Sequence, residues 1–123
     1  MFELRVEGEF SSSHQLYGYK GKCEELQGHN WRVEMYVKGE KLNEIGLLVD
    51  FKDLRELLKK TLDHLDHKFL NRIKPFDSIN PSAENIAKFI YENVQAEINK
   101  LGIILSKIIV FETSKSMACY SKD

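Results

Sequence analysis

The sequence predicts an α+β fold in which two helices cover one face of a four-stranded antiparallel sheet. Hydrophobic residues first alternate with a period of two, which is typical of half-buried strands, and later follow a helical period. Strands and helices are grouped in the order ββααββ, which favours one helical layer packed on one sheet. The predicted strands are 2–10, 29–38, 104–112 and 117–121, and the predicted helices are 51–63 and 83–101.

Length and composition limit the classes of protein that fit. The chain has 123 residues, so residues 1–123 are expected to form a single domain. Its 18 basic and 19 acidic residues nearly cancel, which argues against a nucleic-acid partner. No apolar segment reaches the length of a membrane span, and the N-terminal residues alternate in polarity, unlike a signal peptide. A cytoplasmic protein with no membrane partner is expected.

The connection between the first two predicted strands is unusually long. Even-numbered residues from Phe2 to Phe10 are apolar or small, and odd-numbered residues from Trp31 to Val37 are apolar. Between the strands, residues 11–28 hold three serines and three glycines together with His14, Cys23 and Gln27. Long connections in small domains are usually functional, so the site is expected here.

The two helices have clear start and stop signals. Asp50 is the predicted N-cap of the first helix, and the second begins after Asn80-Pro81 or at Ser82 and ends before Gly102. A hairpin through residues 113–116 then joins the last two strands. The edges and uncovered face of such a sheet need partners, so the chain is expected to form a homo-oligomer.

The two cysteines have different surroundings. A pair of thiols excludes a disulfide framework of the kind found in small secreted domains. Cys119 lies in an apolar segment and is expected to be a small buried residue. Cys23 has polar neighbours and lies close to histidine, which makes it the candidate for chemistry.

Strand parity places two histidines on one face. If the first strand continues to His14, this ring shares a face with Phe10, while His29 shares a face with Trp31. Imidazole is a common zinc ligand, and Gln27, two residues before His29, can reach the same ion. Two histidines without a common role are the more frequent explanation of such spacing.

A further cluster follows the first helix, where Asp63, His64, Asp66 and His67 lie within five residues. An aspartate beside a histidine can orient the imidazole, and with Cys23 the pair would form a proton relay. A solvated helix end is the simpler alternative, and a second metal site from His64 and His67 is a weaker one.

Glu112 continues an apolar strand face, where an unpaired carboxylate is costly. It can accept two hydrogen bonds from a guanine-like or pterin-like ring, or simply mark the strand end. Backbone N–H groups around Ser82, Ala83 and Glu84 at the second helix N-terminus can bind a ligand, although capping is the commoner role.

Taken together, the motifs resemble the 6-pyruvoyl-tetrahydropterin synthase family, and most closely its bacterial 6-carboxy-tetrahydropterin synthase branch of queuosine biosynthesis. The resemblance covers residues 2–121. The matching segments, in chain order, are Phe10-Ser11-Ser12-Ser13-His14, Cys23-Glu24-Glu25-Leu26-Gln27-Gly28-His29-Asn30, Leu65-Asp66-His67 with Leu70-Asn71, Asn80-Pro81-Ser82-Ala83-Glu84-Asn85 and Phe111-Glu112-Thr113.

The resemblance implies a fold and a reaction. The fold is the tunnelling fold, whose subunits close into β-barrels, usually hexamers made of two trimers. The substrate is 7,8-dihydroneopterin triphosphate, which loses triphosphate and, in the carboxy branch, acetaldehyde. The family's zinc ligands match His14 and His29, and its catalytic residues match Cys23, Asp66 and His67. Its ring-binding residues match Glu112 and the segment Ser82, Ala83 and Glu84.

One position departs from the family pattern Cys-x-x-x-His-Gly-His, because Gln27 replaces the middle histidine. An amide oxygen is a poorer zinc ligand than imidazole, so zinc is expected to bind weakly or to be absent. We hypothesise that a parent enzyme had histidine here and that the substitution impairs turnover. A natural variant that tolerates the amide is the alternative.

Two other functions compete with the carboxy synthase. A 6-pyruvoyl-tetrahydropterin synthase would eliminate triphosphate and keep all side-chain carbons. A non-catalytic pterin-binding oligomer would keep the fold and Glu112 without the metal. The basic residues that would contact triphosphate, such as Lys20 or Lys22, are not determined by the sequence.

Overall fold

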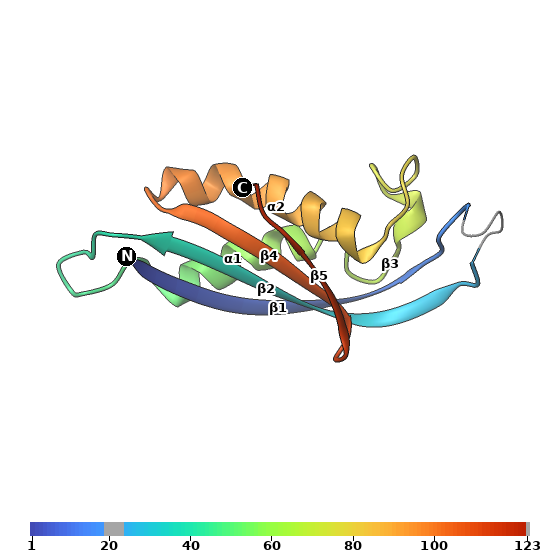
Figure 1. Cartoon of the computed structure of the whole chain (residues 1–123), viewed down its shortest axis with the longest axis horizontal. Helices are drawn as coiled ribbons and strands as arrows, with labels where there is room; N and C mark the ends of the chain where they lie inside the picture. Colours follow the sequence, from blue (N-terminus) through green and yellow to red (C-terminus); the bar gives the residue numbers. More distant parts are fainter. Residues whose placement is uncertain (19–23, 123) are drawn as a thin grey trace.

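The computed structural model describes residues 1–18 and 24–122. Two helices lie on the same side of a long, twisted sheet (Figure 1). The α+β class and the predicted element order are therefore confirmed. The elements are β1 (Phe2–His14), β2 (Gln27–Gly39), α1 (Phe51–Leu62), β3 (Lys68–Phe69), a 3-10 turn (Leu70–Arg72), α2 (Ala83–Lys100), β4 (Ile104–Thr113) and β5 (Ser116–Tyr120).

The sheet has five strands in the described residues, in the order β3-β1-β2-β4-β5, and the prediction of four antiparallel strands was incomplete. The additional strand β3 pairs in parallel with Ser12 and Ser13 of β1. It is only two residues long and follows His67, whose φ of 56° turns the chain back toward β1. A segment this short has no hydrophobic period, so a sequence pattern cannot reveal it.

Both long strands extend further than predicted. The polar residues Ser11–Ser13 continue β1, because they pair in register with Gly28–Asn30 of β2. This extension shortens the connection between the strands to residues 15–26. In Figure 1 this end of β1 and β2 projects beyond the other strands. His14 and Gln27 thus become paired strand residues at the end of the sheet.

The predicted helix signals are confirmed. The Asp50 side chain accepts a hydrogen bond from the Lys52 N–H, and the Ser82 side chain accepts one from the Asn85 N–H. Gly102 follows α2 with a φ of 76°, the left-handed conformation typical of a residue after a helix. No helix of the described residues is long and apolar enough to cross a membrane.

The hydrophobic core lies between the helices and the inner face of the sheet. Gly8 allows α1 to approach closely, since a Cβ atom there would lie 2.9 Å from Leu62 Cδ1. The largest fully buried side chains of this core include Phe10, Trp31, Met35, Leu54, Leu58, Ile86, Ile90 and Ile108.

The expectation that Cys119 is buried was wrong, because its side chain is exposed. In the edge strand β5, Tyr120 faces α2 and its ring packs against Tyr91. Cys119, one residue earlier, therefore points to the face that the helices leave uncovered.

Candidate metal and substrate site

His14 and His29 meet at the end of the sheet. Ser12 pairs with His29 and His14 pairs with Gln27, so the two histidines are diagonal neighbours on β1 and β2. Their ring centroids are 5.2 Å apart, and both rings meet the edge or face of Trp31 at 5.0 and 5.1 Å. The face shared by the two histidines, predicted from strand parity, is confirmed.

His14 is held with one nitrogen ready to bind a cation. Its side chain is 2% exposed, and its Nδ1 lies 2.8 Å from the carbonyl oxygen of Pro81. Because a carbonyl only accepts, Nδ1 is the nitrogen that carries the proton in the neutral ring, and Nε2 is the nitrogen available to bind a cation. Among the described residues, His14 Nε2 is the one buried side-chain polar atom without a hydrogen-bond partner. An oriented imidazole with a carbonyl behind it is the usual arrangement of a metal-bound histidine.

Glu112 completes the cluster from β4. Its Oε2 lies 3.9 Å from His14 Nε2, and its Oε1 lies 3.7 Å from His29 Nε2. One ligand atom from each of the three residues lies within 4.8 Å of the others. Ligand atoms at 2.0–2.1 Å from a tetrahedral zinc ion would be roughly 3.4 Å apart. The donor set and spacing therefore fit a zinc-sized cation.

The protonation of His29 is also suited to metal binding. Burial lowers the pKa of His29 below its usual value, and the nearby Glu112 carboxylate opposes this effect only in part. A neutral imidazole is the form that ligates metals. The lowered pKa of His29 therefore favours the form of this ring that can bind a cation.

Gln27 lies at the same end of β2. Its Oε1 is 3.2 Å from His29 Nε2, so the amide reaches the nitrogen that would bind the cation. An imidazole N–H donates to an amide oxygen at this distance, and metal binding would require that proton to leave. The structure places Gln27 beside the cluster, as the sequence predicted.

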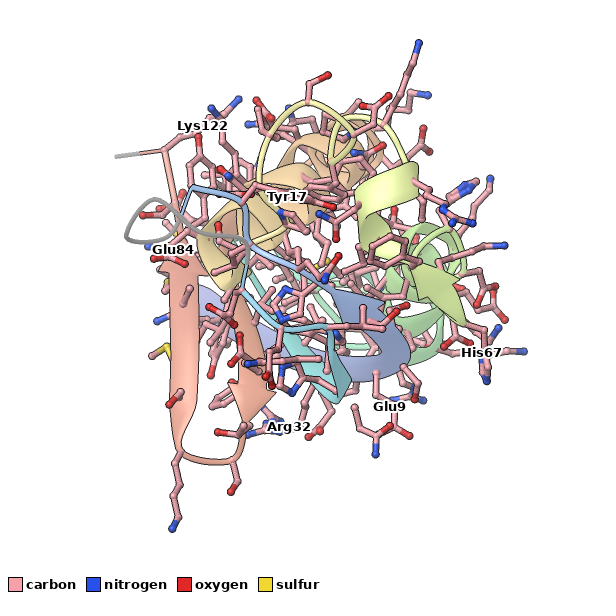
Figure 2. All side chains as sticks on the ribbon, turned by 90° about the vertical axis from the view of Figure 1, so that its right-hand side faces the viewer. Glu9, Tyr17, Arg32, His67, Glu84 and Lys122 are labelled. Carbon is pink, nitrogen blue, oxygen red and sulfur yellow. The ribbon has the colours of Figure 1, made fainter. Side chains whose placement is uncertain are left out.

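Asp66 and His67 form a separate pair. The Asp66 carboxylate accepts a hydrogen bond from the Ser11 N–H at 2.9 Å and lies 2.9 Å from His67 Nδ1. The Ser11 hydrogen bond, supported by His67, lowers the pKa of Asp66. The His67 ring is 83% exposed and points outward from the fold (Figure 2). Asp66 and His67 are thus in direct contact, and neither belongs to the His14–His29–Glu112 cluster.

The structure does not support a second metal site at His64 and His67. Among the described residues, the one group of three or more His, Cys, Asp or Glu side chains with ligand spacing is His14, His29 and Glu112.

The predicted ring-binding segment opens α2. The Ser82 hydroxyl caps the helix by accepting from the Asn85 N–H at 3.1 Å, so its side chain has the structural role that the sequence also allowed. Pro81, directly before it, holds His14. Glu84 is exposed and lies on the opposite side of the molecule from His67 in Figure 2. The helix start therefore belongs to the surroundings of the histidine cluster.

Cys23 lies outside the described residues, as do Lys20 and Lys22, but the ends of their loop are well defined. The Glu24 N–H donates to the Leu16 carbonyl at 2.8 Å, which joins the two ends. This hydrogen bond fixes the residue that follows Cys23.

Two asparagines that the sequence analysis gave no role hold the first end of this loop. The Asn71 side chain accepts from the Gln15 N–H and donates to the Gln15 carbonyl, at 2.9 and 2.8 Å. Asn80 makes the same pair of bonds with Tyr17, both at 2.8 Å. Each carboxamide thus pairs with the backbone N–H and carbonyl of one residue, Gln15 or Tyr17, as a neighbouring strand would. The signal in the sequence that could have indicated this role is the pair of asparagines at the two ends of the 71–80 segment.

Comparisons with known proteins give a consistent result. The family model described as 6-pyruvoyl tetrahydropterin synthase matches residues 3–123. A 6-carboxy-5,6,7,8-tetrahydropterin synthase of Synechocystis is 34% identical over 98% of this chain and 93% of its own length. A 6-pyruvoyl tetrahydrobiopterin synthase of Dictyostelium discoideum is 33% identical over 90% of this chain and 89% of its own.

A solved structure supports the fold. The Caenorhabditis elegans 6-pyruvoyl tetrahydropterin synthase superposes with a TM-score of 0.87 at 24% identity, covering 99% of this chain and 96% of that one. At this identity the similarity concerns the fold.

Proposed function

The chain belongs to the 6-pyruvoyl tetrahydropterin synthase family, whose members are lyases, and we propose that it is a zinc-dependent 6-carboxy-5,6,7,8-tetrahydropterin synthase. It would convert 7,8-dihydroneopterin triphosphate to carboxytetrahydropterin with loss of triphosphate and acetaldehyde, in the queuosine pathway. One pterin-synthase domain would span residues 1–123. The observation that carries the proposal is the buried His14 Nε2, whose free lone pair faces His29 and Glu112.

The protein groups would divide the work in the following way. His14 and His29 would hold the ion, with Gln27 as a weak third ligand. A bound zinc ion supplies a Lewis acid that acidifies the C–H and O–H groups of the substrate side chain. Cys23 would remove a side-chain proton as the thiolate, which is the reactive form of cysteine.

The other two groups of residues complete this scheme. Asp66 would hold the imidazole of His67 in one orientation for proton transfer, as their 2.9 Å contact allows. Glu112 and the segment Ser82, Ala83 and Glu84 would bind the pterin ring.

A homo-oligomer, as a hexamer of two trimers, is part of the proposal. The edge strand β5 exposes Met117, with 53% of its surface accessible, and the free thiol of Cys119. Unpaired edges of this kind are usually covered by another chain. The outward direction of His67 is consistent with service to the site of a neighbouring copy. A cytoplasmic location would keep both thiols reduced.

A 6-pyruvoyl-tetrahydropterin synthase is the second candidate, because relatives of both names are similar to this chain to nearly the same degree. The two reactions differ in one product, since only the carboxy route releases acetaldehyde. A non-catalytic pterin-binding oligomer is the third candidate, favoured by Gln27 at the family's histidine position.

The test is to incubate the full chain and Zn²⁺ with 7,8-dihydroneopterin triphosphate and to measure triphosphate and acetaldehyde. Release of both supports the carboxy synthase, and triphosphate alone supports the pyruvoyl synthase. The Cys23→Ala variant should lose release, whereas a pure binding protein would be unchanged. Gln27→His should bind zinc more tightly and react faster. Equal zinc content and equal rates would contradict a weakening effect of Gln27.

A further inference from the structure

We propose that the Glu112 carboxylate is the third strong ligand of the zinc ion bound by His14 and His29, in place of the imidazole that position 27 lacks. This inference rests on the proposed zinc function and changes the role of one residue. The pterin ring would then be bound without a direct contact to this carboxylate.

The strand register aims Glu112 at the histidines. Phe111 pairs with Arg32 on β2, so Glu112 follows at the end of the sheet where His29 and His14 lie. It shares the inner face of β4 with the fully buried Ile108 and Val110. A carboxylate on this face is desolvated in part, with its side chain 34% exposed.

The two oxygens of Glu112 divide between the two rings. Oε1 lies 3.7 Å from His29 Nε2, and Oε2 lies 3.9 Å from His14 Nε2. These separations exceed hydrogen-bond distance and are slightly larger than the roughly 3.4 Å between neighbouring ligands of tetrahedral zinc. A small contraction around an ion would bring one oxygen and both nitrogens to ligand distance.

The local charges also call for a cation. In the described part of the chain, the ion-pair contacts of Glu112 are with the two imidazoles. The Nδ1 of His14 donates to the Pro81 carbonyl, which leaves the other nitrogen of this ring, Nε2, directed at Glu112. Imidazoles carry no permanent positive charge, so a divalent ion bound between them would provide the charge that this partly buried carboxylate requires.

The ligand set makes chemical sense for an enzyme. Two histidines and one carboxylate form a known catalytic zinc site that keeps a fourth position open for water or substrate. An anionic carboxylate binds zinc better than the neutral amide of Gln27. Histidine at position 27 would release Glu112 from the ion, so the two positions should compensate for each other.

The experiment is a double-mutant cycle on zinc affinity, measured by titration of the full metal-free chain with Zn²⁺ against a chelator of known affinity. Glu112→Gln keeps the shape of the side chain and should weaken zinc binding at least about 100-fold, more than loss of an outer partner usually does. Gln27→His in the Glu112→Gln background should restore most of that loss. Glu56→Gln removes an exposed carboxylate from α1 and should leave zinc affinity unchanged.

A second readout reports the coordination itself. In the Co²⁺-loaded chain, Glu112→Gln should change the visible absorption, because a directly bound group is exchanged. A chain whose zinc affinity and Co²⁺ spectrum are the same with and without Glu112→Gln overturns this inference and leaves the zinc enzyme intact. If the parent chain binds no zinc but Gln27→His does, the inference also fails, while the histidine site of the family remains. If neither binds zinc, the proposed zinc function fails as well.

Discussion

Two polar clusters lie on opposite faces of the same pair of strands, and they differ in whether their groups are satisfied. On the uncovered face, Glu34 accepts from Arg5 at 3.0 Å, from Tyr36 at 3.0 Å and from Arg32. On the inner face, His14 Nε2 has no partner.

The difference separates structure from function. Glu34 is buried, yet every charge around it is paired, and the Arg5 hydrogen bond is the main cause of its lowered pKa. Such a network stabilises the sheet, and its polar groups already have the partners that a ligand would otherwise provide. The inner cluster leaves a desolvated nitrogen unsatisfied, which costs stability unless something binds there. Buried polar groups of this second kind are the better guide to a site.

The largest effect should come from removing the unsatisfied nitrogen. His14→Phe should lower triphosphate release about 1,000-fold, because loss of the metal removes roughly 4 kcal/mol of transition-state stabilisation. The free energy of unfolding of the metal-free chain should change by less than about 1 kcal/mol, since the lost bond to Pro81 offsets the removal of an orphaned acceptor. Steady-state kinetics and urea unfolding measure the two quantities. A large loss of stability with normal activity would reverse the assignment.

The same comparison shows what the sequence could predict. Alternation and capping residues were sufficient for the two helices and four main strands, because each of these is a local pattern. The alternation of side chains along each strand was also sufficient to place His14 and His29 on one face. This placement requires only that β1 continues through the three serines before His14. Gln27 was correctly placed beside them for the same reason.

The remaining features depend on contacts between distant segments. The strand β3 exists because the left-handed His67 directs its N–H to the Ser11 carbonyl. The exposure of Cys119 depends on which face of the edge strand β5 is covered by helix α2. The proximity of Glu112 to the histidines requires the register of β4 against β2, which no local pattern contains.

The second prediction concerns the satisfied cluster. Glu34→Gln should lower the free energy of unfolding by about 1–2 kcal/mol at pH 7, less than a fully buried pair would lose because both arginines are partly exposed. Zinc content and turnover should stay within twofold of the parent chain. Denaturant unfolding and metal analysis provide the test, and a loss of zinc would show that the two faces are coupled.

The pH dependence of this difference follows from the lowered pKa of Glu34. A carboxylate whose folded pKa lies below its usual value of 4.5 stabilises the protein above that value. This contribution is lost as the pH falls through the folded pKa. The stability difference between the parent chain and Glu34→Gln should therefore be full at pH 6–7 and shrink below about pH 4. A difference that grows on acidification would contradict the assigned pairing.

The smallest effect should come from the asparagines that hold the loop beside the inner cluster. Asn71→Ala removes two hydrogen bonds to Gln15 and should lower kcat about fivefold, because the loop that carries Cys23 is held less precisely. Stability should fall by about 1 kcal/mol, and zinc content should not change, since His14 and His29 keep their strand positions. Asn93→Ala is the matched control, because among the described residues its side chain bonds within α2, to the Phe89 carbonyl. If both variants lower kcat equally, general destabilisation explains the loss. If Asn71→Ala alone lowers kcat, the hydrogen bonds of Asn71 to the loop contribute to the reactivity of the His14 cluster.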